Sequence, residues 1–254
     1  MLRPRIIPTL LLHNKGLYKT VNFNTPKYVG DPINAVKIFN EKEVDELILL
    51  DIDATVKEES PNFELIKKIA NECRMPFCYG GGIKKVSDAE KIISLGVEKI
   101  ALSSVVIKNL KFISDVSKSI GVQSVVVILD YKKTGFFKKN QIFINNGNQN
   151  THIELYDFIY KLNKIGIGEL VLNSIDKDGT GNGFDLITAK KVRLLTNFPL
   201  TILGGANSFG DIMNLIDEFG IIGASAGSLF VFKGKYKAVL INYPNIDDKN
   251  SLIK

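Results

Sequence analysis

A glycine-rich pattern occurs twice in this chain, and this internal repeat constrains the fold more than any other feature of the sequence. Residues 76–83 (PFCYGGGI) return in similar form at residues 199–206 (PLTILGGA). In each copy an apolar run of strand length precedes the glycines, and a helix-like segment and a second apolar run follow them. A strand, a helix and a strand that occur twice in this order predict an α/β fold built by duplication.

The glycines and small residues of the repeat indicate binding sites for phosphate. Glycine lets backbone N–H groups come close to an anion, and the N-terminus of the following helix adds partial positive charge. A glycine pair such as Gly204-Gly205 can also be only a tight turn. However, the second strand of each copy also ends in small residues, Ser103-Ser104 and Gly227-Ser228. We therefore expect two phosphate sites and a ligand that is phosphorylated at both ends.

Eight apolar runs of strand length alternate with amphipathic segments along the chain. The predicted strands are residues 5–12, 46–51, 77–79, 99–102, 124–130, 169–173, 200–203 and 222–225. Apolar residues recur at helical spacing in residues 86–95, 109–119, 153–165, 185–196 and 209–219, and two more helices begin near residues 31 and 61. In 254 residues this alternation predicts a single domain, residues 1–254, folded as a (β/α)8 TIM barrel of two repeated half-barrels.

Two connections are longer than a barrel requires, namely residues 13–30 and residues 131–150. Both follow the C-terminal end of a predicted strand, where barrels place their active sites. We expect the first connection to be a mobile lid that carries Lys19, which is either a ligand contact or an ordinary solvated lysine. We expect the second connection to contain a small hairpin over residues 136–147.

The composition and the apolar pattern exclude several classes of protein. The net charge is +6, but the lysines are spread over many helices, so we expect no nucleic-acid partner. The longest apolar stretches are of strand length and the first residues lack the apolar core of a signal peptide, so we expect a cytoplasmic protein without a membrane partner. Two cysteines and two histidines without metal-binding spacing predict no metal site, and no redox cofactor is indicated.

Carboxylates at the ends of predicted strands are candidates for proton transfer. Asp130 ends the fifth strand, and partial burial at the barrel mouth would raise its pKa toward a useful range. The alternative is that Asp130 only caps a turn. Asp51 and Asp53 follow the second strand, and Asp176 and Asp178 follow the sixth. Asp178 precedes a glycine-rich stretch, so it either shapes this loop or contacts a ligand hydroxyl.

Four charged residues stand at the starts of predicted strands, at the opposite end of the barrel. They are Arg5, Glu46, Lys99 and Glu169, on the first, second, fourth and sixth strands. Strand starts converge on the floor of a barrel, so we expect a ring of ion pairs there. Such a ring either closes the floor for stability or serves as a gate, because buried charges are costly unless they are fully paired or used.

Taken together, these residues resemble the cyclase subunits of imidazole glycerol phosphate synthase, a family of (β/α)8 barrels of histidine biosynthesis. The matches cover nearly the whole chain in order, from Arg5-Ile6-Ile7 through Gly30-Asp31-Pro32, Gly80-Gly81-Gly82-Ile83 and residues 174–180 to Gly204-Gly205-Ala206. The resemblance implies an enzyme subunit that receives ammonia from a glutaminase docked on the barrel floor. It also implies that the ammonia passes through the barrel to a small molecule held by two phosphates.

The resemblance further implies roles for individual residues. The family's floor gate falls on the four charged residues at the strand starts, all of the expected type, and its lid lysine falls on Lys19. Asp130 matches one of the family's two catalytic aspartates, and Asp51 is a further candidate. The phosphate sites fall on Gly82, Ser103 and Ser104 in the first half and on Asp178, Gly179, Gly205, Gly227 and Ser228 in the second.

Departures from the family pattern concentrate at the substrate end. Leu11 replaces the first catalytic aspartate and cannot transfer a proton, and Leu203 stands where the family has a small polar residue. We therefore expect a divergent paralogue that keeps the ammonia route. Its acceptor is either the histidine-pathway bisphosphate or an acetamido nucleotide sugar, which ammonia would convert into an acetamidino sugar for a surface polysaccharide or flagellar glycan. A third alternative is a non-catalytic barrel that activates a partner glutaminase.

Overall fold

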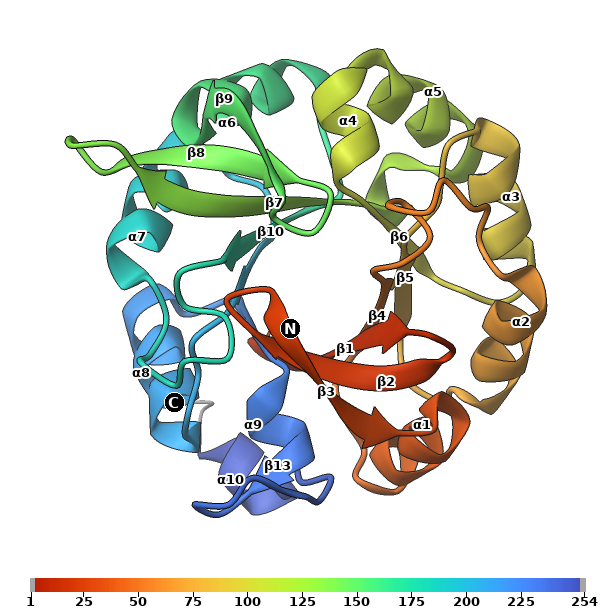
Figure 1. Ribbon diagram of the computed structural model, residues 1–254, viewed down its shortest axis with the longest axis vertical. Coiled ribbons are helices and arrows are strands. Elements are labelled where there is room, and N and C mark those ends of the chain that lie inside the picture. Colours follow the sequence, from red (N-terminus) through yellow and green to blue (C-terminus); the bar gives the residue numbers. More distant parts are fainter. Residues whose placement is uncertain (1–2, 252–254) are drawn as a thin grey trace.

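Eight parallel strands close into a barrel in the computed structural model, which describes residues 3–251 (Figure 1). Each strand pairs with the next along the chain, and the last pairs with the first. All eight predicted strands are confirmed, with ends that agree to within one residue except in β7, which continues four residues beyond Asp130. The barrel strands are β1 (Arg5–His13), β4 (Leu47–Asp51), β5 (Phe77–Gly80), β6 (Lys99–Leu102), β7 (Val125–Thr134), β10 (Glu169–Ser174), β11 (Leu200–Leu203) and β12 (Gly223–Ala226).

Amphipathic helices surround the barrel, as the helical spacing predicts (Figure 1). The Asp31 side chain caps the first helix by accepting the N–H of Asn34 at 2.8 Å, and Asn62 caps the second in the same way. None of the helices described in residues 3–251 is long and apolar enough to cross a membrane. The surrounding helices are α1 (Pro32–Glu41), α2 (Phe63–Glu72), α3 (Val86–Ser94), α5 (Lys111–Ile120), α6 (Leu155–Ile165), α7 (Leu186–Leu195) and α8 (Phe209–Phe219).

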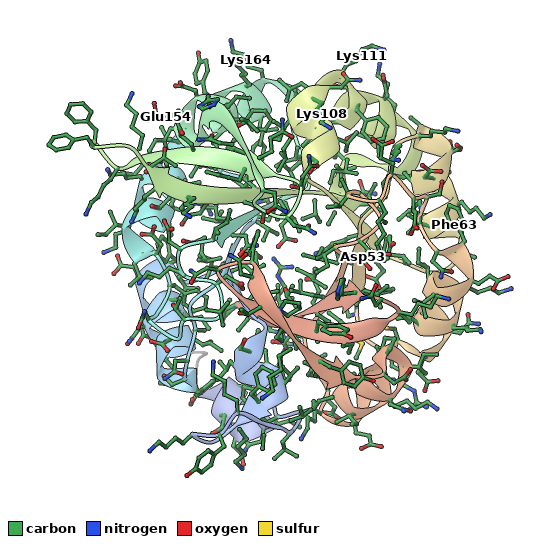
Figure 2. All side chains as sticks on the ribbon, viewed as in Figure 1. Asp53, Phe63, Lys108, Lys111, Glu154 and Lys164 are labelled. Carbon is green, nitrogen blue, oxygen red and sulfur yellow. The ribbon has the colours of Figure 1, made fainter. Side chains whose placement is uncertain are left out.

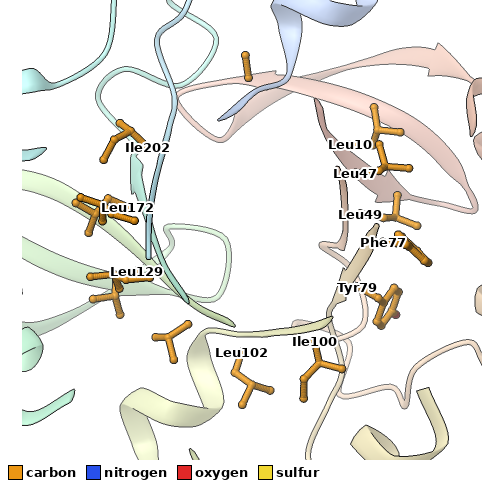
Figure 3. Close-up of a cluster of buried hydrophobic side chains, with 14 of the residues drawn as sticks. Leu10, Leu47, Leu49, Phe77, Tyr79, Ile100, Leu102, Leu129, Leu172 and Ile202 are labelled. Carbon is orange, nitrogen blue, oxygen red and sulfur yellow. The ribbon is translucent and has the colours of Figure 1, made fainter. Parts of the chain in front are cut away.

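The core has two layers because successive side chains of a strand point to opposite faces. In Figure 3 the side chains of Leu47, Leu49, Phe77 and Tyr79 point away from the barrel axis, toward the helices. The intervening residues point inward and form a smaller apolar cluster inside the barrel. That inner cluster comprises Ile7, Ile48, Cys78, Ala101, Val126, Ile128, Val171 and Leu203. The barrel interior is therefore packed with apolar side chains.

The two long connections both form additional strands. Residues 16–30 make an antiparallel hairpin, β2 (Gly16–Val21) and β3 (Asn24–Gly30), which pairs with the end of β1. The sequence pattern predicts a lid here but not its strands, because their pairing with β1 depends on the barrel itself. The predicted second hairpin is confirmed: β8 (Lys139–Ile144) pairs with β9 (Gln149–Glu154) and, on its other side, with β7.

Short elements that the helical spacing does not predict complete the described chain. The helices α4 (Ser104–Lys108) and α9 (Ser228–Val231) follow β6 and β12 at the C-terminal end of the barrel. A short pair of strands, β13 (Phe232–Lys233) and β14 (Ala238–Val239), and the helix α10 (Ile246–Asn250) end the chain. Because α4 and α9 occupy equivalent places after the small-residue strand ends, they extend the internal repeat.

Candidate active site at the C-terminal mouth of the barrel

A cavity of about 490 Å³ lies at the C-terminal ends of the barrel strands. Its wall combines residues from both halves of the chain with three residues of the β2–β3 hairpin, Lys19, Thr20 and Phe23. It is therefore the place where residues of the repeat and of the first long connection meet. The predicted site residues that line it are Lys19, Asp51, Gly82, Ser103, Ser104, Asp130, Asp178 and Gly227.

Asp130 lies on β7 in the wall of this cavity. Burial raises the pKa of its carboxyl group to about 7, and the nearby Asp178 adds to this rise. Hydrogen bonds from Asn173 and Ser103 act in the opposite direction. A carboxyl group with a pKa near neutrality is well suited to accept and return a proton.

Asn173 is a site residue that the sequence prediction misses. It lies on β10 directly opposite Asp130 in the β7–β10 pairing, and its Nδ2 donates to Asp130 Oδ1 at 2.8 Å. Its Oδ1 is buried without a hydrogen-bond partner, although the residue lines the cavity. A polar residue at the end of an otherwise apolar predicted strand was the available signal.

Lys19 is buried, with 5% of its surface exposed, so the alternative of an ordinary solvated lysine is wrong. Its Nζ donates to the backbone oxygen of Thr9 on β1. Burial lowers the pKa of the Lys19 ammonium group to about 8, although the carboxylate of Asp178 opposes this change. The hairpin therefore places an amine of reduced basicity in the wall of the cavity.

Asp178 holds the β2–β3 hairpin against the second half of the barrel. Its Oδ2 accepts a hydrogen bond from Thr20 Oγ1 at 2.8 Å and one from the backbone N–H of Phe23 at 3.2 Å. The next residue, Gly179, has a φ of +65°, and a side chain there would come within 2.2 Å of the backbone oxygen of Thr20. Asp178 therefore shapes this loop and also lines the cavity.

The two predicted phosphate sites are not equivalent. Gly82, Ser103 and Ser104 of the first site line the cavity, and so do two lysines that we do not predict, Lys84 and Lys108. Lys108 lies on α4 at the rim of the barrel (Figure 2). In the second site only Asp178 and Gly227 line the cavity, whereas Gly179, Gly204, Gly205 and Ser228 do not.

The hairpin accounts for this difference between the halves. Thr20 packs over Gly179, and a side chain at Gly227 would come within 2.4 Å of Lys19 Nζ. Gly205 faces away from the cavity, since a side chain there would meet the backbone oxygen of Gly183 at 2.2 Å. The duplicated glycines thus form close backbone contacts in both halves, but only the first half presents an open phosphate site.

The other candidate carboxylates are engaged in local contacts. Asp51 lines the cavity, and its Oδ1 accepts the N–H groups of Asp53 and Ala54 at 3.0 Å each. Burial raises the pKa of Asp51 despite these hydrogen bonds. Asp53 contacts His13 Nδ1 at 2.6 Å, and its pKa is lowered because hydrogen bonds to its carboxylate outweigh the effect of burial. Within residues 3–251 no three His, Cys, Asp or Glu side chains are grouped so that they could hold a metal ion.

Leu11 also lines the cavity, so the place that would need a second acid has an apolar side chain. Leu50, Ile128 and Leu203 line the cavity too. A proton cannot be taken up by any of these side chains. Proton transfer in this cavity is therefore left to the titratable residues that line it, among them Asp130, Asp51 and Lys19.

The four charged residues at the strand starts meet at the opposite end of the barrel. Arg5 Nη2 lies 2.8 Å from Glu169 Oε1, and Lys99 Nζ lies 2.8 Å from Glu46 Oε1 and 2.9 Å from Glu169 Oε2. Arg5 also pairs with Glu46, which closes the ring. Burial alone would raise the pKa of Glu169, but the two cations lower it to about 2. We call these four residues the floor ring.

A protein-family comparison matches residues 5–237 to a family described as "Histidine biosynthesis protein". The chain is 54% identical over 252 residues to a protein of Leptospira borgpetersenii named "Putative imidazole glycerol phosphate synthase subunit HisF". That alignment covers 99% of each chain.

Relatives whose names begin with the word "Putative" are more similar to this chain than relatives named without that word. The chain is 52% identical to "Putative imidazole glycerol phosphate synthase subunit hisF3" of Vibrio vulnificus, over 100% of this chain and 98% of that protein. It is 37% identical to "Imidazole glycerol phosphate synthase subunit HisF" of Natranaerobius thermophilus, over 96% of each chain. This difference in identity is consistent with a divergent paralogue.

Proposed function

The chain belongs to the family of histidine biosynthesis proteins, and on this premise we propose that it is an ammonia-using synthase subunit of a glutamine amidotransferase complex, of the kind that imidazole glycerol phosphate synthase represents. Its relatives are named as subunits, so a partner subunit belongs to the proposal. We place a glutaminase at the barrel floor and the acceptor of ammonia in the cavity at the other end.

The floor ring is the observation that carries this proposal. Two acids with 3–4% of their side chains exposed are neutralised by one arginine and one lysine across the barrel axis. Burying four charges costs more than an apolar plug would, so stability alone is a weak reason for the ring. A lysine that swings aside from two carboxylates would open a passage for a small neutral molecule.

The barrel interior above the floor ring supports passage of ammonia rather than ammonium. Its apolar side chains offer no compensation for a bare cation, whereas neutral ammonia needs only a few hydrogen-bond partners. One wall supplies such partners: Thr201 Oγ1 donates to Glu169 at 2.5 Å, and Thr9 Oγ1 lies 2.6 Å from Ser225 Oγ. These hydroxyl groups lead from the ring toward Lys19, which bonds to Thr9.

The cavity supports a phosphorylated acceptor. Gly82, Ser103 and Ser104 offer small residues for a phosphate group, and Lys84 and Lys108 add positive charge at the rim. In this proposal Asp130 transfers the proton, Lys19 contacts the ligand, and Asp51 stays a candidate for a second proton transfer. The second phosphate site, from Asp178 to Ser228, would be used when the hairpin moves.

The identity of the acceptor depends on Leu11. Closure of an imidazole ring in the histidine pathway would use a second acid at this position. The side chain there is that of Leu11, which lines the cavity and cannot act as an acid. Addition of ammonia to the carbonyl group of an acetamido nucleotide sugar requires proton transfer and stabilisation of one oxygen, which Asp130 and Lys19 can supply. The apolar wall at Leu11 and Leu203 favours this second candidate.

Product formation by the purified chain tests the proposal. We would supply ammonium chloride with the histidine-pathway bisphosphate in one reaction and with acetamido nucleotide sugars in another, and identify products by mass spectrometry. Turnover of the bisphosphate would establish the histidine-pathway reaction without an acid at Leu11. Amidination of a sugar alone would establish the second candidate. Absence of product from either class would contradict an ammonia-using synthase.

Asp130→Asn separates catalysis from the third alternative, a non-catalytic activator of a glutaminase. We expect this variant to lose product formation by at least a hundredfold with ammonium chloride, because the amide cannot transfer the proton. Glutamine hydrolysis in the presence of the partner should stay within twofold of the wild type, since the floor ring is unchanged. Unchanged product formation by Asp130→Asn would show that Asp130 is not the group that transfers the proton. Stimulated glutamine hydrolysis without product from the wild type would favour the activator instead.

A further inference from the structure

Asn173 has an acceptor atom that nothing in the described structure satisfies. The residue is 5% exposed, its Nδ2 is bound to Asp130 at 2.8 Å, and its Oδ1 has no hydrogen-bond partner. A buried acceptor without a partner loses its hydrogen bonds to water and gains none in return, so such atoms are rare in folded proteins. Asn173 lines the cavity, although its Oδ1 exposes less than 1 Å² of surface, so a ligand there reaches this atom when the side chain shifts slightly.

A second buried asparagine shows why the location matters. Asn140 on β8 also has an unpartnered Oδ1, and its Nδ2 bonds to Tyr156 and Thr188. Asn140 does not line the cavity, so no ligand there can reach its acceptor. Asn173 differs because its amide and the carboxylate of Asp130 stand side by side in the cavity wall, on paired positions of β10 and β7.

The surroundings of these two acceptors limit the chemistry of the ligand. Ile128 and Leu203, in the same part of the wall, offer no hydrogen bonds. Two adjacent acceptors, one neutral and one acidic, require a ligand with at least two hydrogens on one small polar atom. Water and a nitrogen that carries N–H bonds both meet this requirement, and an anion such as phosphate does not. Of the two, only the nitrogen is a substrate of the proposed reaction.

We propose that Asn173 Oδ1 and the Asp130 carboxylate together form the seat for ammonia where it leaves the barrel. This inference rests on the proposed function, because the barrel interior delivers the nitrogen. Two N–H bonds point to the two acceptors, so the nitrogen lone pair points away from the β7–β10 wall and into the cavity. Asn173 is thus a binding residue for the nucleophile, beside the residue that takes its proton.

In the chemical step that follows, Asp130 alone can carry out both proton transfers. The nitrogen lone pair forms a C–N bond with a carbonyl carbon of the acceptor, and the electron pair of the C=O π bond moves to the oxygen. The nitrogen then carries one proton too many, which passes to the carboxylate of Asp130. The protonated Asp130 can return this proton to the new alkoxide oxygen, which completes the addition.

Binding of ammonia, supplied as ammonium chloride, can be measured without a molecule for it to attack. The measurement is 13C NMR of the aspartate carboxyl carbons at about pH 9, where both carboxylate and free ammonia are present. The Asp130 signal is assigned with Asp130→Asn. We expect ammonium chloride to shift it in a saturable way, and potassium chloride to leave it unchanged, because potassium has the charge and size of ammonium but no N–H bonds. An equal response to both salts would overturn the proposal.

Three variants make the test specific. Asn173→Leu should bind ammonia at least tenfold more weakly, whereas Asn173→Asp keeps a hydrogen-bond acceptor in place and should still bind it. Asn140→Leu removes the other buried asparagine with an unpartnered oxygen and should bind ammonia as the wild type does. An unchanged response in Asn173→Leu would overturn the seat.

Failure of the seat and failure of the proposed function give different results. If the protein forms product from ammonium chloride and Asn173→Leu binds ammonia as the wild type does, only the proposed seat is wrong. Saturable ammonia binding that depends on Asn173, without product from either class of acceptor, would support the seat and contradict the proposed reaction.

Discussion

Asp130 and Lys19 carry unusual pKa values because the fold buries them beside a cavity. Desolvation raises the pKa of the acid to about 7 and lowers that of the base to about 8, so both groups change protonation state near neutrality. Neither shift comes from an ion pair between the two. Titratable groups with shifted pKa values are common at functional sites, where burial costs stability but makes the groups reactive near neutral pH.

The raised pKa of Asp130 predicts a pH-dependent cost to stability. The folded protein keeps a proton on Asp130 up to about pH 7, whereas the unfolded chain releases it near the ordinary value of 3.8. This group therefore makes the fold less stable as the pH rises from about 4 to about 7. Asp130→Asn lacks this cost, and we expect it to gain up to roughly 3 kcal/mol over the wild type between these limits.

Urea unfolding of both proteins at a series of pH values checks this expectation. Contributions from all other groups are shared by the two proteins and cancel in the difference. A difference in unfolding free energy that stays constant from pH 4 to pH 8 would show that Asp130 ionises normally in the folded state.

At the level of elements, the β2–β3 hairpin decides how the duplicated barrel differs between its halves. Hydrogen bonds from Thr20 and Phe23 to Asp178 fasten the hairpin to the second half, while the first phosphate site stays open. The hairpin also carries Lys19 into the cavity wall. One element therefore covers one phosphate site and completes the wall of the other.

Gly179→Ala should release the hairpin from the second half of the barrel. The new methyl group would come within 2.2 Å of the Thr20 backbone oxygen, which cannot move without displacing β2. We expect faster hydrogen exchange over residues 16–30 by at least tenfold, measured by mass spectrometry, and at most a small change in the barrel strands.

Gly181→Ala is the matched control for this variant. Gly181 has a similar φ, +69° against +65° for Gly179, but the three atoms nearest to a methyl group there all belong to the side chain of Asn207, the closest at 2.9 Å. Both variants carry the same backbone strain, so only the collision with the hairpin differs. Equal exchange rates over residues 16–30 in the two variants would argue against hairpin docking at Gly179.

Two features of the whole molecule join parts of the chain that are distant in sequence. The outer apolar cluster runs from Ile6 to Val231 around the barrel, and the floor ring joins β1, β6 and β10 and the residue before β4. Both connect the two half-barrels. We therefore propose that residues 1–254 unfold as one domain rather than as two separate halves.

Unfolding followed by two independent spectroscopic probes tests whether the chain unfolds as a single domain. The chain has eight tyrosines and no tryptophan, so tyrosine near-UV circular dichroism can report tertiary packing beside far-UV circular dichroism for the helices. We expect one urea transition with the same midpoint by both probes. Separate midpoints would indicate half-barrels that unfold independently.

The floor ring predicts non-additive effects on stability. Lys99→Met leaves two buried carboxylates with one cation, and we expect a loss of about 3 kcal/mol. Adding Glu46→Gln restores a balance of one acid and one cation, so the double variant should be less destabilised than the sum of the two single variants. Additive losses in urea unfolding would mean that the four residues do not act as a unit.

Much of this fold was predictable from local patterns in the chain. Strand and helix periodicities locate all eight barrel strands and the surrounding helices, because burial on one face or both imposes those patterns on the sequence itself. The floor ring was predictable as well, since residues at strand starts converge wherever a barrel closes. The same reasoning places Asp130 and Asp51 at the mouth.

Contacts between segments that are distant in sequence could be identified only from the tertiary structure. The pairing of Asn173 with Asp130 joins residues on different strands, and the burial of Lys19 follows from the docking of the hairpin on Asp178. Neither contact leaves a periodic signal, because it depends on which segments the closed barrel brings together. For the same reason, the repeat predicts two equal phosphate sites, while the docked hairpin leaves only one of them open.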